Sequence, residues 1–335
     1  MNHAATYLTI AQGLCKFHSK WSAKSVETYA GISRLRAAKY INQLIDRDFL
    51  RFGPKHTKAK PQYFITPFAE LTCRPNPTDV VPDREASDTL WLPSTLIQGR
   101  PGKMSTPLSE LIATQEITPL RVLIDLYADQ NLVADGGISR QVVHQGYKKE
   151  LVGERGAVIV WAFVSDGYMH RGSSERWKNI CKGGPFWDAI STLTSLGLLA
   201  CVPHLTQSDS LDSEIVHALP NLYSQGPLES ETSVSRAALE AGLWLLTPEL
   251  RHKKENGPLR EALLVPVKRH LPKIHCFGIF RLTHRPQTKL TAEWTLHSQR
   301  NAETYIPFYQ RLALEGARAE ETALQEYKKN LVKSA

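Results

Sequence analysis

The chain has 335 residues, of which 42% are hydrophobic and 22% charged, so its composition is that of a folded protein and not of a disordered one. No apolar run approaches the roughly 18 to 20 residues that cross a membrane, and we see no signal peptide, so we expect a cytoplasmic protein without a membrane partner. The net charge of +8 lies entirely in residues 1–75, which hold twelve Lys or Arg and four acidic residues, whereas the rest holds 29 of each. Such a cationic unit attracts a polyanion, and nucleic acid, acidic proteins or anionic lipids would all fit.

Three helices followed by a two-stranded hairpin are predicted over the first 65 residues. Ser22 is placed to cap the second helix and Gly31 to close it, and Ser33 is placed to cap the third. The two strands are joined by the lysine-rich loop GPKHTKAKP. The helices are expected at 4–18, 23–30 and 34–47, and the strands at 49–52 and 62–65.

The rest of the chain alternates helical and strand-like segments. Residues 72–107 hold six prolines and little periodicity, which predicts a linker. Helical period then returns at 118–131, within 184–205 and at 235–246, and one or two amphipathic helices are expected from about residue 301. Apolar runs predict strands at 156–164, after the helix within 184–205, and at 214–219, 262–268, 274–282 and 290–296.

Residues 25–52, SVETYAGISRLRAAKYINQLIDRDFLRF, carry a recognisable pattern. A short helix is followed by a G-I-S turn, by a longer helix with an apolar residue at every third or fourth position, and by a strand. With the basic hairpin that follows, this stretch resembles the winged helix-turn-helix family of DNA-binding domains, over about a fifth of the chain. The apolar positions of the family pattern are occupied by Ile32, Ala37, Ile41, Leu44 and Phe49, and Asp48 stands where the family usually has glycine.

The helix at 34–47 is the candidate for reading DNA. If Ala37, Ala38, Ile41, Leu44 and Ile45 face inward, the arginines and Gln43 face outward, and in a major groove Arg pairs with guanine and Gln with adenine. Ser33 at the helix start suits a phosphate, and the loop lysines suit the flanking backbone or the minor groove. The candidate DNA-binding residues are Ser33, Arg34, Arg36, Lys39, Tyr40, Gln43, Lys55, His56, Lys58 and Lys60.

A second, weaker copy of the pattern follows. WDAISTLTSLGLLACVPHL again ends in L-x-x-L-G-L-L before a strand, and the helix at 118–131 could open this unit. Its wing, TQSDSLDSE, is acidic and its helix presents no base outward, so DNA would be repelled and dimerisation or docking is the expected role. The predicted fold is therefore helix-rich α+β, divided into a winged helix at 1–71, a linker at 72–107, a second winged-helix-like domain at 108–225 and an α/β region with terminal helices at 226–335.

No catalytic or cofactor motif is found. The chain has no P-loop, no G-x-S-x-G and no H-E-x-x-H, and its five cysteines are scattered without a CxxC pair. Enzymatic activity, a cofactor, a metal site and a disulfide framework are therefore not expected.

The leading hypothesis is a bacterial-type transcriptional regulator that binds double-stranded DNA in a sequence-specific manner, acts as a homodimer and can contact a protein partner through its C-terminal region. Two winged-helix units in one chain also resemble replication initiators of plasmids or mobile elements. A third interpretation is a subunit of a larger complex that holds nucleic acid without sequence preference.

Overall fold

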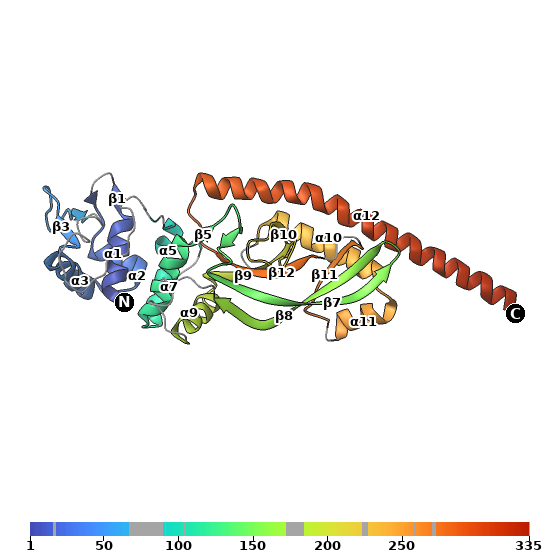
Figure 1. Ribbon diagram of the computed structural model, residues 1–335. Helices are drawn as coiled ribbons and strands as arrows, with labels where there is room; N and C mark the ends of the chain where they lie inside the picture. The colour runs from blue at the N-terminus through green and yellow to red at the C-terminus, as the bar shows by residue number, and fades with distance from the viewer. Residues whose placement is uncertain are drawn as a thin grey trace. The chain divides into compact units, whose positions relative to one another are not determined.

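A computed structural model gives the fold of the chain, which is α+β (Figure 1). It divides into two compact units, here named unit 1 (Met1–Ala128, Cys181–Leu198 and His284–Pro286) and unit 2 (Asp129–Ile180, Leu199–Thr283 and Gln287–Ala335). The structure describes residues 1–15, 18–66, 90, 92–102, 105–171, 184–222, 227–257, 259–269 and 273–334.

This division differs from the four parts expected from the sequence. Residues 108–225 do not form a unit of their own, because their described helices belong to unit 1 and their described strands to unit 2. Much of the expected linker at 72–107 lies outside the described residues. Its described end forms the short helix α5 (Ser94–Gln98), in which Leu96 and Ile97 are buried.

Unit 1 begins with the predicted order of three helices and a hairpin. Its small sheet has the strand order β1-β2-β4-β3, and in the described part of the unit four further helices follow. The helices are α1 (Asn2–Gln12), α2 (Ala23–Ala30), α3 (Arg34–Asp46), α5, α6 (Pro107–Ala113), α7 (Ile117–Ala128) and α9 (Gly184–Ser195), and the strands are β1 (Leu14–Cys15), β2 (His18–Ser19), β3 (Leu50–Phe52) and β4 (Tyr63–Ile65).

The predicted helix at 4–18 is too long. It ends at Gln12, and Leu14 and Cys15 form a strand that pairs with β2. The ring of Trp21 packs directly on Gly13, where an added Cβ would overlap the ring. A glycine that admits this close approach therefore ends the helix, although the apolar stripe of the sequence continues past it.

Unit 2 is built on a six-stranded sheet with the order β10-β9-β12-β7-β8-β11, in which neighbouring strands run antiparallel. Its strands are β7 (Val143–Arg155), β8 (Val158–Arg171), β9 (Leu199–Thr206), β10 (Ile215–Ala218), β11 (Leu263–Lys268) and β12 (His275–Leu282), beside the small pair β5 (Gln130–Asn131) and β6 (Gly137–Ile138). Its helices are α10 (Glu229–Leu245), α11 (Pro248–Asn256) and α12 (Lys289–Ser334).

Most strands predicted in this region are confirmed, and one is wrong. The runs at 156–164, 262–268 and 274–282 lie in β8, β11 and β12, and 214–219 returns antiparallel to β9 as β10. The run at 290–296 instead begins the long helix α12, because Trp294, Ser298 and Ala302, spaced by one helical turn, are all buried. The long hairpin partner β7 was not predicted.

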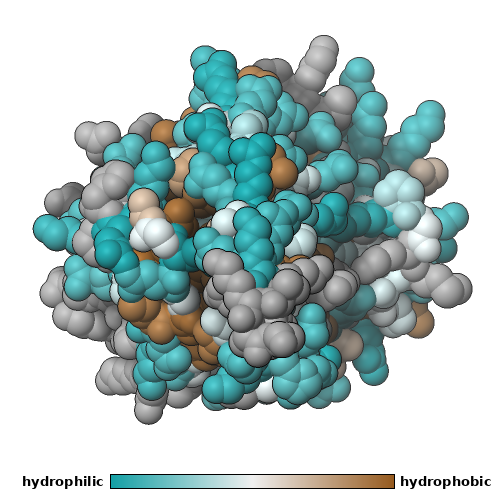
Figure 2. Space-filling model, turned by 90° about the vertical axis from the view of Figure 1, so that its right-hand side faces the viewer, coloured by the Kyte–Doolittle hydropathy of each residue, from teal (hydrophilic) through white to brown (hydrophobic). Residues whose placement is uncertain are grey.

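The core of unit 2 lies where α10 and α12 pack against the sheet. Val160, Val265 and Leu264 of the sheet share one apolar cluster with Ala241 of α10 and Leu312 of α12. Among the coloured residues of Figure 2 most are hydrophilic, and apolar ones gather in a limited area. Among the described helices, including α12, none combines the length and the apolar character that crossing a bilayer requires.

A buried ion pair ties α10 to the sheet. Arg281 of β12 donates from Nη1 to Oε2 of Glu231 at 2.6 Å and from Nη2 to Oε1 at 2.9 Å, and both side chains are almost fully buried. Nη2 also donates to Nε2 of His204 at 2.6 Å, and the guanidinium lies over the ring of Trp294. Gly136 approaches this cluster so closely that a Cβ would lie 3.2 Å from Nη2 of Arg281.

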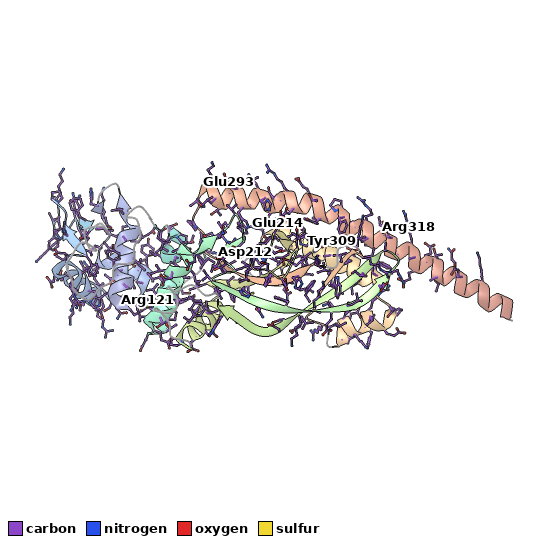
Figure 3. The ribbon with its side chains drawn as sticks, in the orientation of Figure 1. Arg121, Asp212, Glu214, Glu293, Tyr309 and Arg318 are labelled. Carbon is purple, nitrogen blue, oxygen red and sulfur yellow. The ribbon has the colours of Figure 1, made fainter. Side chains whose placement is uncertain are left out.

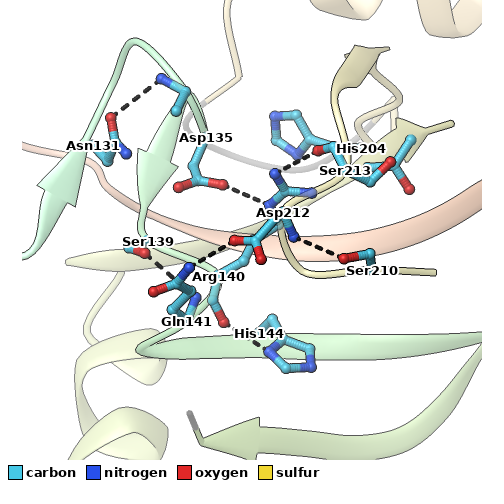
Figure 4. A network of polar contacts seen from close by, with 12 residues as sticks. Asn131, Asp135, Ser139, Arg140, Gln141, His144, His204, Ser210, Asp212 and Ser213 are labelled. Atoms are coloured by element: carbon cyan, nitrogen blue, oxygen red, sulfur yellow. Dashed lines mark hydrogen bonds and ion pairs between the residues drawn. The ribbon is translucent and has the colours of Figure 1, made fainter. Parts of the chain in front are cut away.

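A second buried arginine fixes the turn that precedes β7 (Figure 4). Arg140 donates from Nε to Oδ1 of Asp135 at 2.5 Å and from Nη2 to the carbonyl oxygen of Ser213 at 2.7 Å. Gln141 donates to Oδ1 of Asp212 at 2.7 Å. Burial raises the pKa of Asp135, and Arg140 opposes this shift. These bonds hold the acidic loop between β9 and β10 against the start of β7.

Two buried histidines make the stability of unit 2 dependent on pH. Burial lowers the pKa of His217 to about 4, and burial with the charge of Arg281 lowers the pKa of His204 well below 6.5. In the unfolded chain a histidine has a pKa near 6.5, so on acidification the unfolded state binds protons before the folded state does. The contribution of these two histidines to stability is therefore complete above pH 6.5 and is lost as the pH falls toward 4. For His217 alone we expect the free energy of unfolding to fall by about 1.4 kcal/mol per pH unit in this window. Urea unfolding at several pH values measures this slope, and a His217→Gln variant with an undiminished slope would contradict the assignment.

Candidate nucleic-acid interface

The helix α3 has the predicted inward side. Ala37, Ile41 and Leu44 are buried, and they face α1 and α2, whose Ile10 and Val26 are also buried. This apolar stripe, with a residue at every third or fourth position, fixes the rotation of the helix. The opposite side of α3 therefore faces away from the core of unit 1.

The end of α3 has the geometry that a glycine would give. Asp48 adopts a φ of +58°, in the left-handed region, and the N–H of Phe49 donates back to the carbonyl oxygen of Leu44 at 2.9 Å. This closing bond is typical of helices that end in a left-handed residue. Asp48 stands where the winged-helix pattern has glycine, but it adopts the same left-handed conformation and lets the chain turn from α3 into β3.

The exposed face of α3 carries Arg34, Arg36 and Lys39, as predicted. Neither arginine has a side-chain partner among the described residues. The exposed positions also include Leu35, which is 87% exposed, Ala38 and Asn42. Ala38 was expected inside, and Leu35 and Asn42 were not among the predicted contact residues. Ile45, also expected inside, is only half-buried. The spacing of Ala37, Ile41 and Leu44 fixes which side of the helix is buried, and it could have shown that Ala38 lies outside this side.

Two predicted contact residues are engaged within unit 1. The hydroxyl of Tyr40 accepts from Nδ2 of Asn2 at 3.2 Å, and Oε1 of Gln43 lies 2.6 Å from Nε2 of His3. The His3 ring also packs edge-on against that of Tyr40, with 4.6 Å between centroids. Both side chains are half-buried, so they attach the start of α1 to α3 and are less available to a ligand than the prediction assumed.

The start of α3 already holds an anionic group. The N–H of Arg34 donates to Oε1 of Glu27 at 3.1 Å, and the side chain of Ser33 forms no capping bond. A carboxylate at this position uses a helix N-terminus favourably. It also occupies the place in which the sequence predicted a phosphate beside Ser33, so that part of the prediction lacks support in this geometry.

The loop between β3 and β4, here called the wing (residues 53–62), is ordered by its own backbone. Gly53 N–H donates to the carbonyl oxygen of Gln62 at 2.8 Å, and Lys55 N–H donates to the Gln62 side chain at 3.0 Å. The side chains of Lys55, Lys58 and Lys60 are all exposed. Three cations therefore project from a defined hairpin.

His56 has a structural position in the wing. Its Nδ1 accepts from the N–H of Gln62 at 3.0 Å, and its ring lies against Phe52 and Tyr63, with centroids at 4.4 and 5.2 Å. Burial raises the pKa of Tyr63. His56 was predicted to contact DNA, but here it packs the wing and shapes the loop that carries the lysines.

The helices that follow the hairpin support α2. Oγ1 of Thr106, which caps α6, donates to the carbonyl oxygen of Tyr29 at 2.6 Å. Leu96, Leu108 and Leu111 are fully buried within unit 1. The cationic region is thus attached to a larger body than the 71 residues expected from the sequence.

The helix α9 repeats the helix end of α3. Gly197 has a φ of +67°, and Leu198 N–H donates to the carbonyl oxygen of Leu193 at 2.9 Å, as Phe49 does to Leu44. The exposed positions of α9 carry Asp188 and Ser191 but no Lys or Arg. The exposed side of α9 therefore has no cationic side chain, whereas that of α3 has three.

Among the described residues, no three His, Cys, Asp or Glu side chains lie close enough together to bind a metal ion. What the geometry assembles is a cationic helix face beside a cationic wing. The chain matches no known protein family, no curated protein and no solved structure.

Proposed function

We propose that unit 1 binds double-stranded DNA through a winged helix-turn-helix, with α3 in the major groove and the wing over the adjacent backbone. The observation that carries the proposal is the exposed face of α3, which carries Arg34, Arg36 and Lys39 together with Leu35, Ala38 and Asn42. Arginine presents two donors to the edge of guanine, asparagine presents a donor and an acceptor to the edge of adenine, and a small apolar side chain such as Ala38 suits a thymine methyl group.

The wing supplies positioning and not sequence reading. Lysines at 55, 58 and 60 lie on a loop with fixed backbone hydrogen bonds, and a point charge on a flexible stem recognises phosphates without distinguishing bases. The carboxylate of Glu27 at the start of α3 argues against a phosphate there. We therefore assign phosphate contacts to the wing, and base contacts to the middle of α3.

Replacing Arg36 with alanine is expected to weaken binding to the cognate site by about 1–3 kcal/mol and to relax the preference at one base pair. Once the bound sites have been mapped by footprinting, titration of labelled duplexes with single-base changes measures both effects. Arg121→Ala, which removes an equal charge from the exposed side of α7 in unit 1, is the matched control and should leave affinity almost unchanged (Figure 3).

A wing variant separates reading from positioning. Lys58→Ala should weaken binding to cognate and unrelated duplexes by the same factor, because a phosphate contact carries no sequence information. A loss confined to the cognate site would contradict the role given to the wing. Equal effects of Arg36→Ala and Arg121→Ala would contradict the role given to α3.

For the biological role we propose a regulator that binds DNA as a homodimer, with unit 2 available to a protein partner. The helix end repeated at Gly197 favours a second candidate, an initiator with tandem winged helices, in which the uncharged α9 serves docking. The mapped sites distinguish the two, because a two-fold dimer binds inverted half-sites about one helical turn apart, whereas an initiator binds direct repeats. A subunit of a larger complex would show little sequence preference.

A further inference from the structure

Unit 2 contains a cavity of about 870 Å³ that the proposed DNA binding does not use. It lies between α12 and the ends of strands β9, β10 and β11, and all its lining residues belong to unit 2. Its volume falls in the range of about 300–1,000 Å³ found for small-molecule sites. The cavity is therefore large enough for an organic ligand.

The walls of the cavity are mainly apolar and aromatic. Leu205, Val267 and Ile274 contribute from the sheet side, and Tyr305 and Phe308 contribute from α12. Contact of such apolar walls with water is unfavourable in free energy, so they favour the binding of an apolar group. The apolar part of a ligand would be placed here.

The polar floor of the cavity is neutral. His217 and Tyr309 are both buried, and Nε2 of His217 accepts from the hydroxyl of Tyr309 at 2.8 Å, while Nδ1 donates to the carbonyl oxygen of Ala218 at 3.0 Å. Tyr309 lies on the side of α12 that faces the strands (Figure 3). With both ring nitrogens engaged in this way, the pair fixes the floor and presents no charge to a ligand.

The rim of the cavity is cationic. Lys273 and Arg311 line it, both are exposed, and neither forms an ion pair with any residue in the described part of the chain. Burial raises the pKa of Tyr305, and the negative charge of Glu214 raises it further, so a carboxylate lies near Tyr305. An anion is expected beside Lys273 and Arg311 and away from Tyr305.

We propose that this cavity binds a small amphipathic anion, with its apolar body against Tyr305 and Phe308 and its carboxylate or equivalent group beside Lys273 and Arg311. A guanidinium binds a carboxylate through charge-assisted hydrogen bonds, and the apolar walls exclude a strongly hydrated inorganic ion. The proposal concerns unit 2 alone and stands whether or not unit 1 binds DNA.

The test uses the full chain and the dye 1-anilinonaphthalene-8-sulfonate, displaced by dodecanoate below its micelle concentration. We expect one saturable site per chain, displacement by dodecanoate, and much weaker displacement by dodecanol, which has the same chain length without the charge. Arg311→Ala or Lys273→Ala should weaken dodecanoate binding about tenfold, the loss of one charge-assisted contact. Arg318→Ala, an exposed arginine two turns further along α12 and outside the cavity lining, is the matched control.

A blocking variant tests the location without removing any core group. Thr304 is exposed at the cavity lining, so Thr304→Trp fills the space from outside and should abolish binding while the unfolding temperature stays unchanged. The proposal is overturned if dodecanol competes as well as dodecanoate, if Arg311→Ala and Arg318→Ala bind equally, or if Thr304→Trp binds like the original chain.

Discussion

Replacement of Glu231 by alanine is expected to destabilise unit 2 by about 3–5 kcal/mol, because it leaves the guanidinium of Arg281 buried without its counter-charge. Both side chains of the pair are less than a tenth exposed and are joined by two hydrogen bonds. Their burial between α10 and β12 removes the solvent that would otherwise stabilise a lone cation. Chemical denaturation followed by tryptophan fluorescence, to which Trp294 beside Arg281 contributes, measures the change.

Two controls make this prediction specific. Glu293→Ala breaks the exposed pair with Lys289, whose atoms lie 3.5 Å apart, and should cost less than about 1 kcal/mol. The double variant Glu231→Leu with Arg281→Met removes both charges and should recover much of the lost stability. If the single and double variants were equally unstable, the cost would come from packing and not from the unpaired charge.

Salt is expected to have the largest effect on DNA binding. If α3 and the wing neutralise about four to six phosphates per chain, log K should fall against log salt with a slope of about −4 to −5. Between 50 and 200 mM salt the affinity would then drop by about a hundredfold to a thousandfold. Titration of one duplex at four salt concentrations measures the slope. A nearly flat response would contradict a binding mode based on the cations of unit 1.

The same experiment identifies individual phosphate contacts. Lys58→Ala should reduce the slope by about 0.9, the contribution of one phosphate. Thr57→Ala, in the same loop, changes no charge and should leave the slope as it is, although its hydroxyl accepts from Lys60 N–H and its loss loosens the wing. An unchanged slope in Lys58→Ala would move the phosphate contacts elsewhere on unit 1.

Local signals in the sequence predicted the first helices and several strands. Ser22 and Gly31 delimit α2 as expected, since a cap and a left-handed glycine act on neighbouring residues only. The pairing of β12 with both β7 and β9 joins residues at least 69 positions apart, and no local pattern encodes such a partner. The segment around Trp294 has strand propensity, because it places an aromatic residue among threonines, but the burial of one face against the rest of unit 2 makes it helical.

The candidate interface was predicted in part. Arg34, Arg36 and the wing lysines are exposed as expected, since charged residues avoid burial without a partner. The position of Leu35 could not follow from its apolar character, because exposure depends on helix phase and not on residue type. The contacts of Gln43 with His3 and of Arg34 N–H with Glu27 join separate helices and were not visible in the spacing of residues.

The bond from Thr106 to Tyr29 has a practical consequence for isolating the DNA-binding part. A fragment that stops at residue 71 would lose α5 and α6 and would bare the apolar groups of α1 and α2 that face Leu96 and Leu108. Such a truncated polypeptide should aggregate or stay partly unfolded. A minimal expression boundary therefore belongs beyond Ala128, and α9 has to be supplied with it, because unit 1 recruits that helix from much further along the chain.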